Sequence, residues 1–272
     1  MQTAEAVDEV SGLSDLRQGQ KKTVTEHRKT RAEVLLVLGV SLGYSAVYAL
    51  VDLAGKLTAG KGLSSQTTTL NPSQAAGHPW LDLALQLVQI FFGVVPALLA
   101  LHLLKRDKRQ SRMGFQPPRV AWDAGTGAVL AVVIGIPGLA LYVASHAIGI
   151  NTTVVPEALP FLWWTVPVLL LSAFQNAFLE EVVVVGYLTI RLREMSWSVP
   201  AVVGASALLR GAYHLYQGFG GFIGNAVMGM VFALFFLRFK RVGPLVLAHT
   251  ILDSAAFVGY ALFGGSLTTL GL

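Results

Sequence analysis

Seven long apolar runs, separated by short polar segments, dominate the pattern of hydrophobic and polar positions along this 272-residue chain. Most of the runs are close to the about 20 residues that a helix needs to cross the hydrocarbon core of a bilayer. A short re-entrant segment near the C-terminus would add an eighth. The pattern therefore predicts an all-α, polytopic membrane helix bundle of seven to eight transmembrane helices. The runs cover roughly residues 34–53, 81–104, 125–150, 161–190, 199–216, 222–237 and 244–263.

The polar segments divide the chain into a tail and a helical domain. Residues 1–32 are polar and basic, and we predict that they form a mobile tail in front of a bundle domain at residues 33–272. The first apolar run is too long for the core of a signal peptide, so we interpret it as an uncleaved first helix. Residues 60–79 are rich in Gly, Ser, Thr and Asn, and this composition is typical of a flexible linker.

Composition and charge indicate a membrane protein and exclude several kinds of site and partner. Charged residues make up 13% of the chain. Soluble domains carry about 25% charged residues, roughly twice this share. The absence of cysteine excludes disulfides, thiolate metal sites and a cysteine nucleophile. The net charge of +5 is spread between apolar runs rather than gathered in one patch, so we expect no nucleic-acid partner.

The distribution of lysine and arginine predicts the orientation. These residues fill the N-terminal tail and the loops after the second, fourth and sixth runs, whereas the opposite loops hold only Lys56 and Lys61. By the positive-inside rule, we expect an integral protein of the cell membrane with its N-terminus in the cytoplasm.

Two adjacent carboxylates, Glu180 and Glu181, lie inside the fourth apolar run. A charge at the bilayer centre costs roughly 2.5–3.5 kcal/mol, and intramembrane carboxylates are functional by default. The alternative is that the helix ends here and both carboxylates lie in water. Nine mostly apolar residues follow before Arg191, which favours the intramembrane interpretation.

Two further polar pairs occur in later runs at a spacing of four residues. Arg210 precedes His214 by four positions, and His249 precedes Asp253 by four, so each pair shares a face of a helix. Asn176 and Asn225 are weaker candidates. His102 and His146 stand alone near the ends of runs, and we interpret them as packing residues.

These residue types suit the activation of water. A carboxylate in a water-poor site can act as a general base, and imidazoles can orient water, donate to an oxyanion or protonate a leaving amine. Histidines and carboxylates can also bind zinc, but the HExxH spacing is absent. We therefore expect that no cofactor is required, although a divalent metal remains an alternative.

Three groups of residues, namely the glutamate pair, Arg210 with His214, and His249 with Asp253, follow one another along the chain. In this order they resemble motifs of the CAAX protease and bacteriocin-processing family, also called the type II CAAX prenyl protease or ABI family. The family's first motif is a Glu-Glu pair followed by three residues, an arginine and often a glycine; its second is a phenylalanine four before a histidine; its third is a histidine four before Asn or Asp. The resemblance covers about residues 169–258. The residues that match are Glu180, Glu181, Gly186, Tyr187, Leu188, His214, His249 and Asp253.

The resemblance implies a glutamate-dependent peptidase with its active site inside the membrane. Glu180 would then be the general base together with His214, and Glu181 a supporting acid. His249 would lie on the side of the oxyanion, with Asp253 orienting it. The substrate would be a membrane-embedded or lipidated protein or peptide.

Two positions depart from the family pattern. Val185 stands at the arginine position and Arg210 at the phenylalanine position. We interpret this as a swap, in which an arginine on the next helix balances the glutamate pair, and we predict an ion pair of Arg210 with Glu181 or Glu180. The departures leave two alternatives to an active peptidase: an inactive or bacteriocin-immunity-type member of the family, and a proton-coupled transporter that uses the Glu and His residues as a relay.

Overall fold

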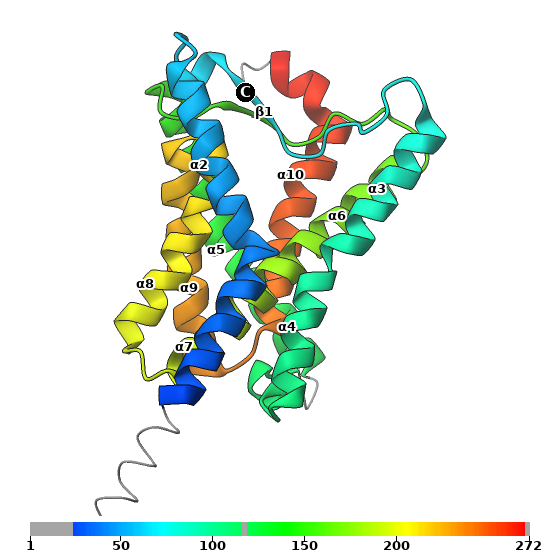
Figure 1. Ribbon diagram of the computed structural model, residues 1–272. Coiled ribbons are helices and arrows are strands. Elements are labelled where there is room, and N and C mark those ends of the chain that lie inside the picture. Colours follow the sequence, from blue (N-terminus) through cyan, green and yellow to red (C-terminus); the bar gives the residue numbers. More distant parts are fainter. Residues whose placement is uncertain (1–23, 116–118, 270–272) are drawn as a thin grey trace, which may run out of the picture.

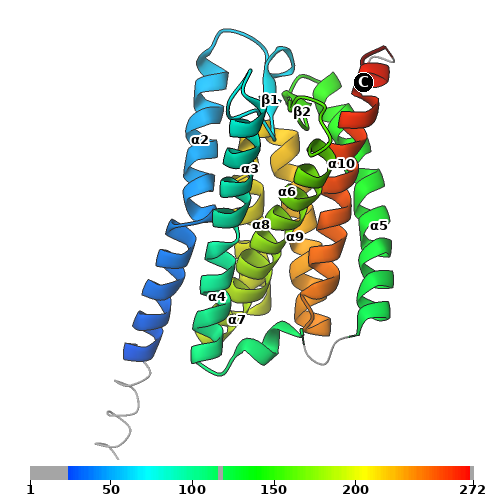
Figure 2. The same ribbon diagram turned by 90° about the vertical axis from the view of Figure 1, so that its right-hand side faces the viewer.

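A computed structural model describes residues 24–115 and 119–269 and shows an all-α bundle of roughly aligned helices (Figures 1 and 2). The predicted fold class is therefore confirmed. Every predicted apolar run has a helical counterpart. In chain order, the elements are the helix Val24–Gly39, α2 Leu42–Thr58, η1 Leu63–Ser65, β1 Thr67–Thr69, α3 Pro79–Gly93, α4 Val95–Arg106, η2 Gln110–Met113, α5 Val120–Ala147, β2 Thr153–Val155, α6 Thr165–Glu180, η3 Glu181–Tyr187, α7 Leu188–Glu194, α8 Val199–Ala212, η4 Leu215–Gln217, α9 Phe219–Phe239 and α10 Gly243–Thr269.

Five helical segments within the described residues are long and apolar enough to cross a membrane, and a sixth arises if the helix Val24–Gly39 and α2, which meet at a bend of 53°, count as one span. The fifth predicted run, residues 199–216, corresponds to α8, which has only 14 residues. It ends at Ala212, short of the predicted end at residue 216. The five long segments are Pro79–Arg106, Val120–Ala147, Thr165–Glu194, Phe219–Phe239 and Gly243–Gly264.

The outer surface of the bundle is apolar, as expected for helices surrounded by lipid. On α3 and α5, large apolar side chains are more than half exposed, because no other helix covers these faces. A soluble protein rarely exposes such a contiguous apolar surface. The side chains are Val88, Phe91, Phe92, Val129, Val132, Val133 and Ile136.

The segment α6–η3–α7 runs through the middle of the bundle (Figure 2). Its η3 part is a π-helix in which all seven residues are buried. π-helical turns are rare and occur frequently at functional sites. Gly186 permits this burial, because a Cβ atom there would lie 2.5 Å from Sδ of Met113.

Two connections pair at one end of the bundle, which we call the strand end. β1 and β2 are parallel, with Thr67 opposite Thr153 and Thr69 opposite Val155. Residues 60–79, which the composition predicted to be a flexible linker, thus contain a short helix and a paired strand. Side-chain contacts such as Asn71 Nδ2 to the carbonyl oxygen of Pro156 (2.9 Å) hold this connection in place.

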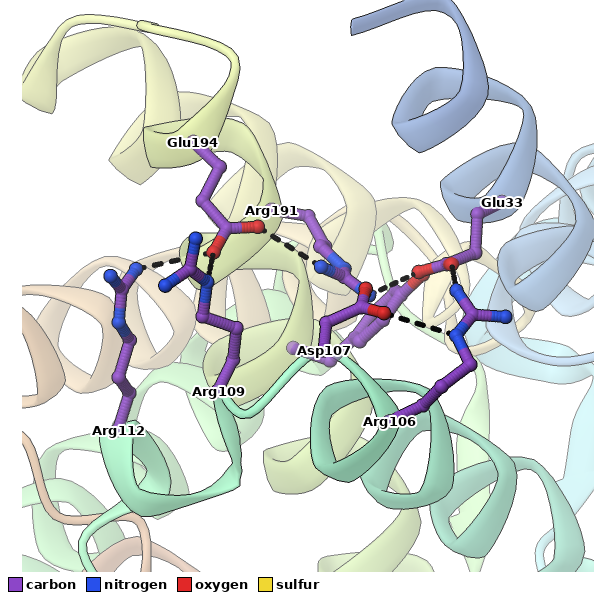
Figure 3. A network of polar contacts seen from close by, with 8 residues as sticks. Glu33, Arg106, Asp107, Arg109, Arg112, Arg191 and Glu194 are labelled. Atoms are coloured by element: carbon purple, nitrogen blue, oxygen red, sulfur yellow. Dashed lines mark hydrogen bonds and ion pairs between the residues drawn. The ribbon is translucent and has the colours of Figure 1, made fainter. Parts of the chain in front are cut away.

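The opposite end, which we call the basic end, carries a network of ion pairs (Figure 3). Arg191, only 3% exposed, is 2.6 Å from Glu33 Oε1, 2.7 Å from Asp107 Oδ2 and 3.0 Å from Glu194 Oε2. The network joins the helix Val24–Gly39, the C-terminal end of α4, η2 and α7. Its other members are Arg106, Arg109 and Arg112. The helix that carries Glu33 begins inside the predicted tail at 1–32, of which positions 1–23 lie outside the described part.

Candidate active site

The two adjacent glutamates lie at the junction of α6 and η3, in the centre of the chain's most buried segment. Glu181 is fully buried, whereas the Glu180 side chain retains 11% of its accessible surface. Glu180 is the last α-helical residue and Glu181 the first residue of the π-helix. The two carboxylates therefore have different environments although they are neighbours in the sequence.

Arg210, in the last turn of α8, faces both carboxylates. Its Nη2 atom lies 2.7 Å from Glu181 Oε1 and 3.2 Å from Glu180 Oε2, so the predicted ion pair is confirmed. The guanidinium also lies 5.3 Å from the ring centroid of Phe232, a cation–π contact. Gly229 on α9 makes room for the side chain, because a Cβ atom at that position would be 3.1 Å from Arg210 Cδ.

His249, in the second turn of α10, completes a compact group. Its Nδ1 atom is 2.8 Å from Glu181 Oε1 and 3.0 Å from Arg210 Nη2. Because a carboxylate only accepts hydrogen bonds, the short contact with Glu181 favours a hydrogen on Nδ1. Asp253 Oδ1 is 3.5 Å from Nε2. Glu181 is therefore closer to the His249 ring than Asp253 is. From the sequence, we had expected Asp253 to orient this ring.

His214 does not lie on α8, contrary to the sequence prediction that it shares a helical face with Arg210. The helix ends at Ala212, and His214 stands in the turn before η4. Its Nδ1 atom is 2.9 Å from the carbonyl oxygen of Arg210, and since a carbonyl only accepts, Nδ1 is the donor. In the neutral ring, Nε2 is then left as an acceptor. Among the described residues, the ring makes no hydrogen bond or ion pair with Glu180, Glu181 or His249.

Sequence reasoning missed Tyr213. Its hydroxyl donates to Glu180 Oε2 at 2.8 Å, and its side chain is only 4% exposed. Its ring also lies 4.7 Å from the ring of His214. The available signal was its position between Arg210 and His214, but a tyrosine in an apolar run resembles any other packing residue.

Several polar atoms in this group have no partner within the described part of the chain. Glu181 Oε2 and Arg210 Nε and Nη1 are buried without a hydrogen bond. The contacts of Glu180 use Oε2, and its Oε1 has no hydrogen-bond partner among the described residues. Buried polar groups are nearly always hydrogen-bonded, so these atoms indicate places for water or for a bound ligand.

A cation could in principle be held here, because ligand atoms of Glu180, Glu181 and His249 lie within 4.8 Å of one another. The guanidinium of Arg210 already contacts all three side chains. A metal ion at this point would have to displace a buried positive charge, so the donor set suits the arginine better than a metal.

The other polar residues that the sequence singled out lie elsewhere. Asn176 lines a separate cavity, and Asn225 Nδ2 donates to the carbonyl oxygen of Gly221 at 3.0 Å. His146 Nε2 is 3.0 Å from Thr153 Oγ1 at the strand end, in keeping with a packing role.

Comparison with known proteins bears on the segment that holds this group. Residues 162–255 match the family model described as type II CAAX prenyl endopeptidase Rce1-like. No curated protein and no solved structure matches the chain. The matched segment runs from the residues before α6 into α10, and it includes the glutamate pair, Arg210 and both histidines. Over this segment, which is about a third of the chain, the resemblance seen in the motifs is confirmed: residues 162–255 are similar to the Rce1-like type II CAAX prenyl endopeptidases.

Proposed function

We propose that the chain is a glutamate-dependent intramembrane endopeptidase in which Glu180 activates the attacking water. The observation that carries this proposal is the asymmetry of the Glu180 carboxylate. Oε2 is held by the Tyr213 hydroxyl at 2.8 Å and by Arg210 at 3.2 Å, while Oε1 has no partner in the described part of the chain. A carboxylate that is fixed through one oxygen and free at the other is well placed to accept a proton.

In this proposal, water adds to the carbonyl carbon of a substrate peptide bond as its proton passes to Oε1 of Glu180. The imidazole of His214 accepts a hydrogen bond from the same water at Nε2. The tetrahedral intermediate then breaks its C–N bond, and the leaving nitrogen receives the proton from Glu180. The products are a new carboxyl group and a new amine.

The developing oxyanion needs hydrogen-bond donors that are fixed before the reaction. We assign this role to Arg210 and His249, which lie 3.0 Å apart beside the two glutamates. His249 lies beside Arg210, and Glu181 and Asp253 hold its ring from the two nitrogen sides. Glu181 also balances the charge of Arg210 and is the supporting acid of this scheme.

The arginine supplies a positive charge where other peptidases use a metal, so the proposal requires no cofactor. The substrate is a membrane-embedded or lipidated peptide that reaches the group from within the bilayer. The loops at the basic end carry most of the lysine and arginine, so we place this end and the N-terminus in the cytoplasm of a cell-membrane protein.

The test is comparative proteomics of membrane peptides from cells that make the wild-type chain or one of three variants. Glu180→Gln and His214→Ala should abolish the same set of cleavage products, while Glu194→Gln, which changes a carboxylate at the basic end, should leave them. Equal amounts of folded protein in all samples would exclude a purely structural effect. Unchanged products with both site variants would refute the mechanism.

A further inference from the structure

A second polar site lies between α3 and α6, and none of the candidate catalytic residues lines it. It is a cavity of about 60 Å³. This volume is enough for roughly four water molecules or one small polar side chain. The segment at residues 70–72 covers it from the strand end. Six uncharged hydrogen-bonding side chains line it: Asn71, Gln86, Gln89, Ser172, Gln175 and Asn176.

Gln175 distinguishes this cavity from an ordinary packing defect. The residue is only 7% exposed, and its amide has no hydrogen-bond partner among the residues that the structure describes. By contrast, Gln86 donates to the carbonyl oxygen of Pro72 at 3.0 Å, and Ser172 donates to Asn71 Oδ1 at 2.9 Å. The amide borders this polar cavity, so a hydrogen-bonding group placed in the cavity can pair with it.

The chain also keeps space for the Gln175 amide. A Cβ atom at Gly93, the last residue of α3, would lie 2.6–2.9 Å from the amide carbon, nitrogen and oxygen of Gln175. A side chain in place of Gly93 would therefore have to displace the flexible end of Gln175. Because no charged side chain lines the cavity, an ion would be buried without compensation, whereas a neutral group that both donates and accepts matches the amides.

The cavity lies one helical turn from the proposed base. Asn176 precedes Glu180 by four residues on α6. This spacing corresponds to about 6 Å along the helix axis. An extended peptide advances about 3.3 Å per residue, so the cavity is roughly two residues from a peptide bond placed at Glu180. The cavity lies toward the strand end of α6.

We propose that this cavity is a substrate subsite for an uncharged hydrogen-bonding side chain (Asn, Gln, Ser or Thr) about two residues from the cleaved bond. This inference rests on the proposed peptidase function. Gln175 is its specificity-determining residue, and Gly93 positions the Gln175 amide. The subsite explains how the enzyme selects among membrane peptides, which are otherwise uniformly apolar.

The test uses a library of membrane-soluble peptides in detergent, in which each position carries Asn, Ser, Ala, Leu, Asp or Lys, with the cleaved bonds located by mass spectrometry. One position about two residues from the cleaved bond should favour Asn and Ser over Ala, Leu, Asp and Lys. A hydrogen bond of about 0.5–1.5 kcal/mol corresponds to a preference of roughly two- to tenfold in kcat/KM.

Three variants decide the assignment to this cavity. Gln175→Leu should remove the preference while the chain stays folded, because an apolar side chain of similar shape replaces an unpartnered amide. Gly93→Ala should weaken the preference by displacing the amide. Asn225→Leu, the matched loss of an amide on α9, should leave it intact. A cavity occupied only by water would give no preference, or one that Gln175→Leu does not change, and either result overturns the proposal.

Binding separates this inference from the peptidase mechanism. The same library should be incubated with Glu180→Gln, and the retained peptides identified. Selective retention of peptides with Asn or Ser without cleavage by the wild type would support the subsite and refute the peptidase. Retention without selectivity would overturn the subsite whatever the wild type cleaves.

Discussion

Among the residues that the structure describes, arginines and carboxylates form one cluster at the basic end and another at the junction of α6 and η3. At the basic end, both oxygens of Glu33, Asp107 and Glu194 have an arginine partner within 3.2 Å (Figure 3). In the candidate active site, only one oxygen of Glu180 and one of Glu181 contacts Arg210. The carboxylate oxygens at the basic end are thus all paired, although Nε of Arg191 is buried there without a hydrogen bond. In the candidate site, by contrast, one oxygen of each glutamate has no partner among the described residues.

The charge balance explains the difference. Four arginines face three carboxylates at the basic end, so every carboxylate oxygen finds a cation. In the candidate site a single arginine faces two carboxylates, with Asp253 beside His249. Saturated ion pairs fix helices relative to one another, whereas a carboxylate with a free oxygen keeps the capacity to take a proton. The predictions below test this contrast.

The largest structural effect should follow from removing the single arginine of the site. Arg210→Met leaves two buried carboxylates without a cation, and breaking a buried pair in this way costs about 3–5 kcal/mol. Thermal unfolding in detergent measures the loss. The control is Arg106→Met, at an arginine whose side chain is 56% exposed. An exposed pair of this kind should cost only about 0–1 kcal/mol.

A second substitution sharpens the test of Arg210. The double variant Arg210→Met with Glu181→Met replaces both partners by apolar side chains, and it should recover part of the lost stability. No recovery would mean that Arg210 contributes through packing, for example against Phe232, and not through its charge.

Tyr213→Phe should reduce peptide hydrolysis without unfolding the chain. The variant loses one hydrogen bond to the Glu180 carboxylate, and such bonds to charged groups contribute about 1.5–3 kcal/mol, which corresponds to a roughly 10- to 100-fold fall in kcat. The control is Tyr216→Phe, because the Tyr216 hydroxyl accepts from the Gln217 amide and makes no hydrogen bond with a carboxylate in the described part of the chain. Equal rates of hydrolysis for the two variants would show that the Tyr213 hydroxyl does not contribute to the reaction.

Gly229→Ala tests the space that α9 leaves for Arg210. The added methyl group would lie 3.1 Å from Arg210 Cδ and from the Cα atom of Ala207. Overpacking of this kind costs about 1–3 kcal/mol. Gly204→Ala is the matched control, because nothing lies within 4 Å of the added atom and alanine favours the helix. Thermal unfolding of the two variants should therefore shift in opposite directions.

The smallest effect concerns acid stability at the basic end. Partial burial by itself would raise the pKa of Asp107, but hydrogen bonds from Arg106 and Arg191 lower this pKa below its ordinary value of 3.8. A lowered pKa in the folded state stabilises the protein above about pH 4, and this contribution is lost as the pH falls through the folded pKa. Asp107→Asn should lose less stability than the wild type between about pH 5 and pH 3 in thermal unfolding, and an equal loss would contradict the contribution of Asp107.

Much of this architecture follows from the sequence, because lipid imposes simple rules. Apolar runs of spanning length must be helices, since no other open structure satisfies the backbone in hydrocarbon. The ion pair of Arg210 followed from charge balance, because a lone buried arginine needs a carboxylate partner. These inferences depend on energies of several kcal/mol, which few local effects can override.

What the sequence did not predict depends on local geometry. The end of α8 at Ala212, the π-helix at Glu181–Tyr187 and the pairing of β1 with β2 arise from tertiary packing rather than from residue pattern. These features set the contact of Tyr213 with Glu180 and leave His214 in a turn. Nothing in the apolar pattern distinguished Gln175 from other polar residues of α6, because its isolation depends on α3 and Gly93.

The most direct test is the rate at which purified protein in liposomes cleaves one identified membrane peptide, compared among the wild type, Glu180→Gln and Glu194→Gln. In this account the free oxygen of Glu180 takes the proton, so Glu180→Gln should lower the cleavage rate about 10²–10⁴-fold, the range of general-base catalysis. Glu194→Gln should cleave at a rate close to that of the wild type. The amount of folded protein is measured in the same liposomes. Wild-type cleavage by folded Glu180→Gln would contradict the claim that the free oxygen of Glu180 carries the reaction.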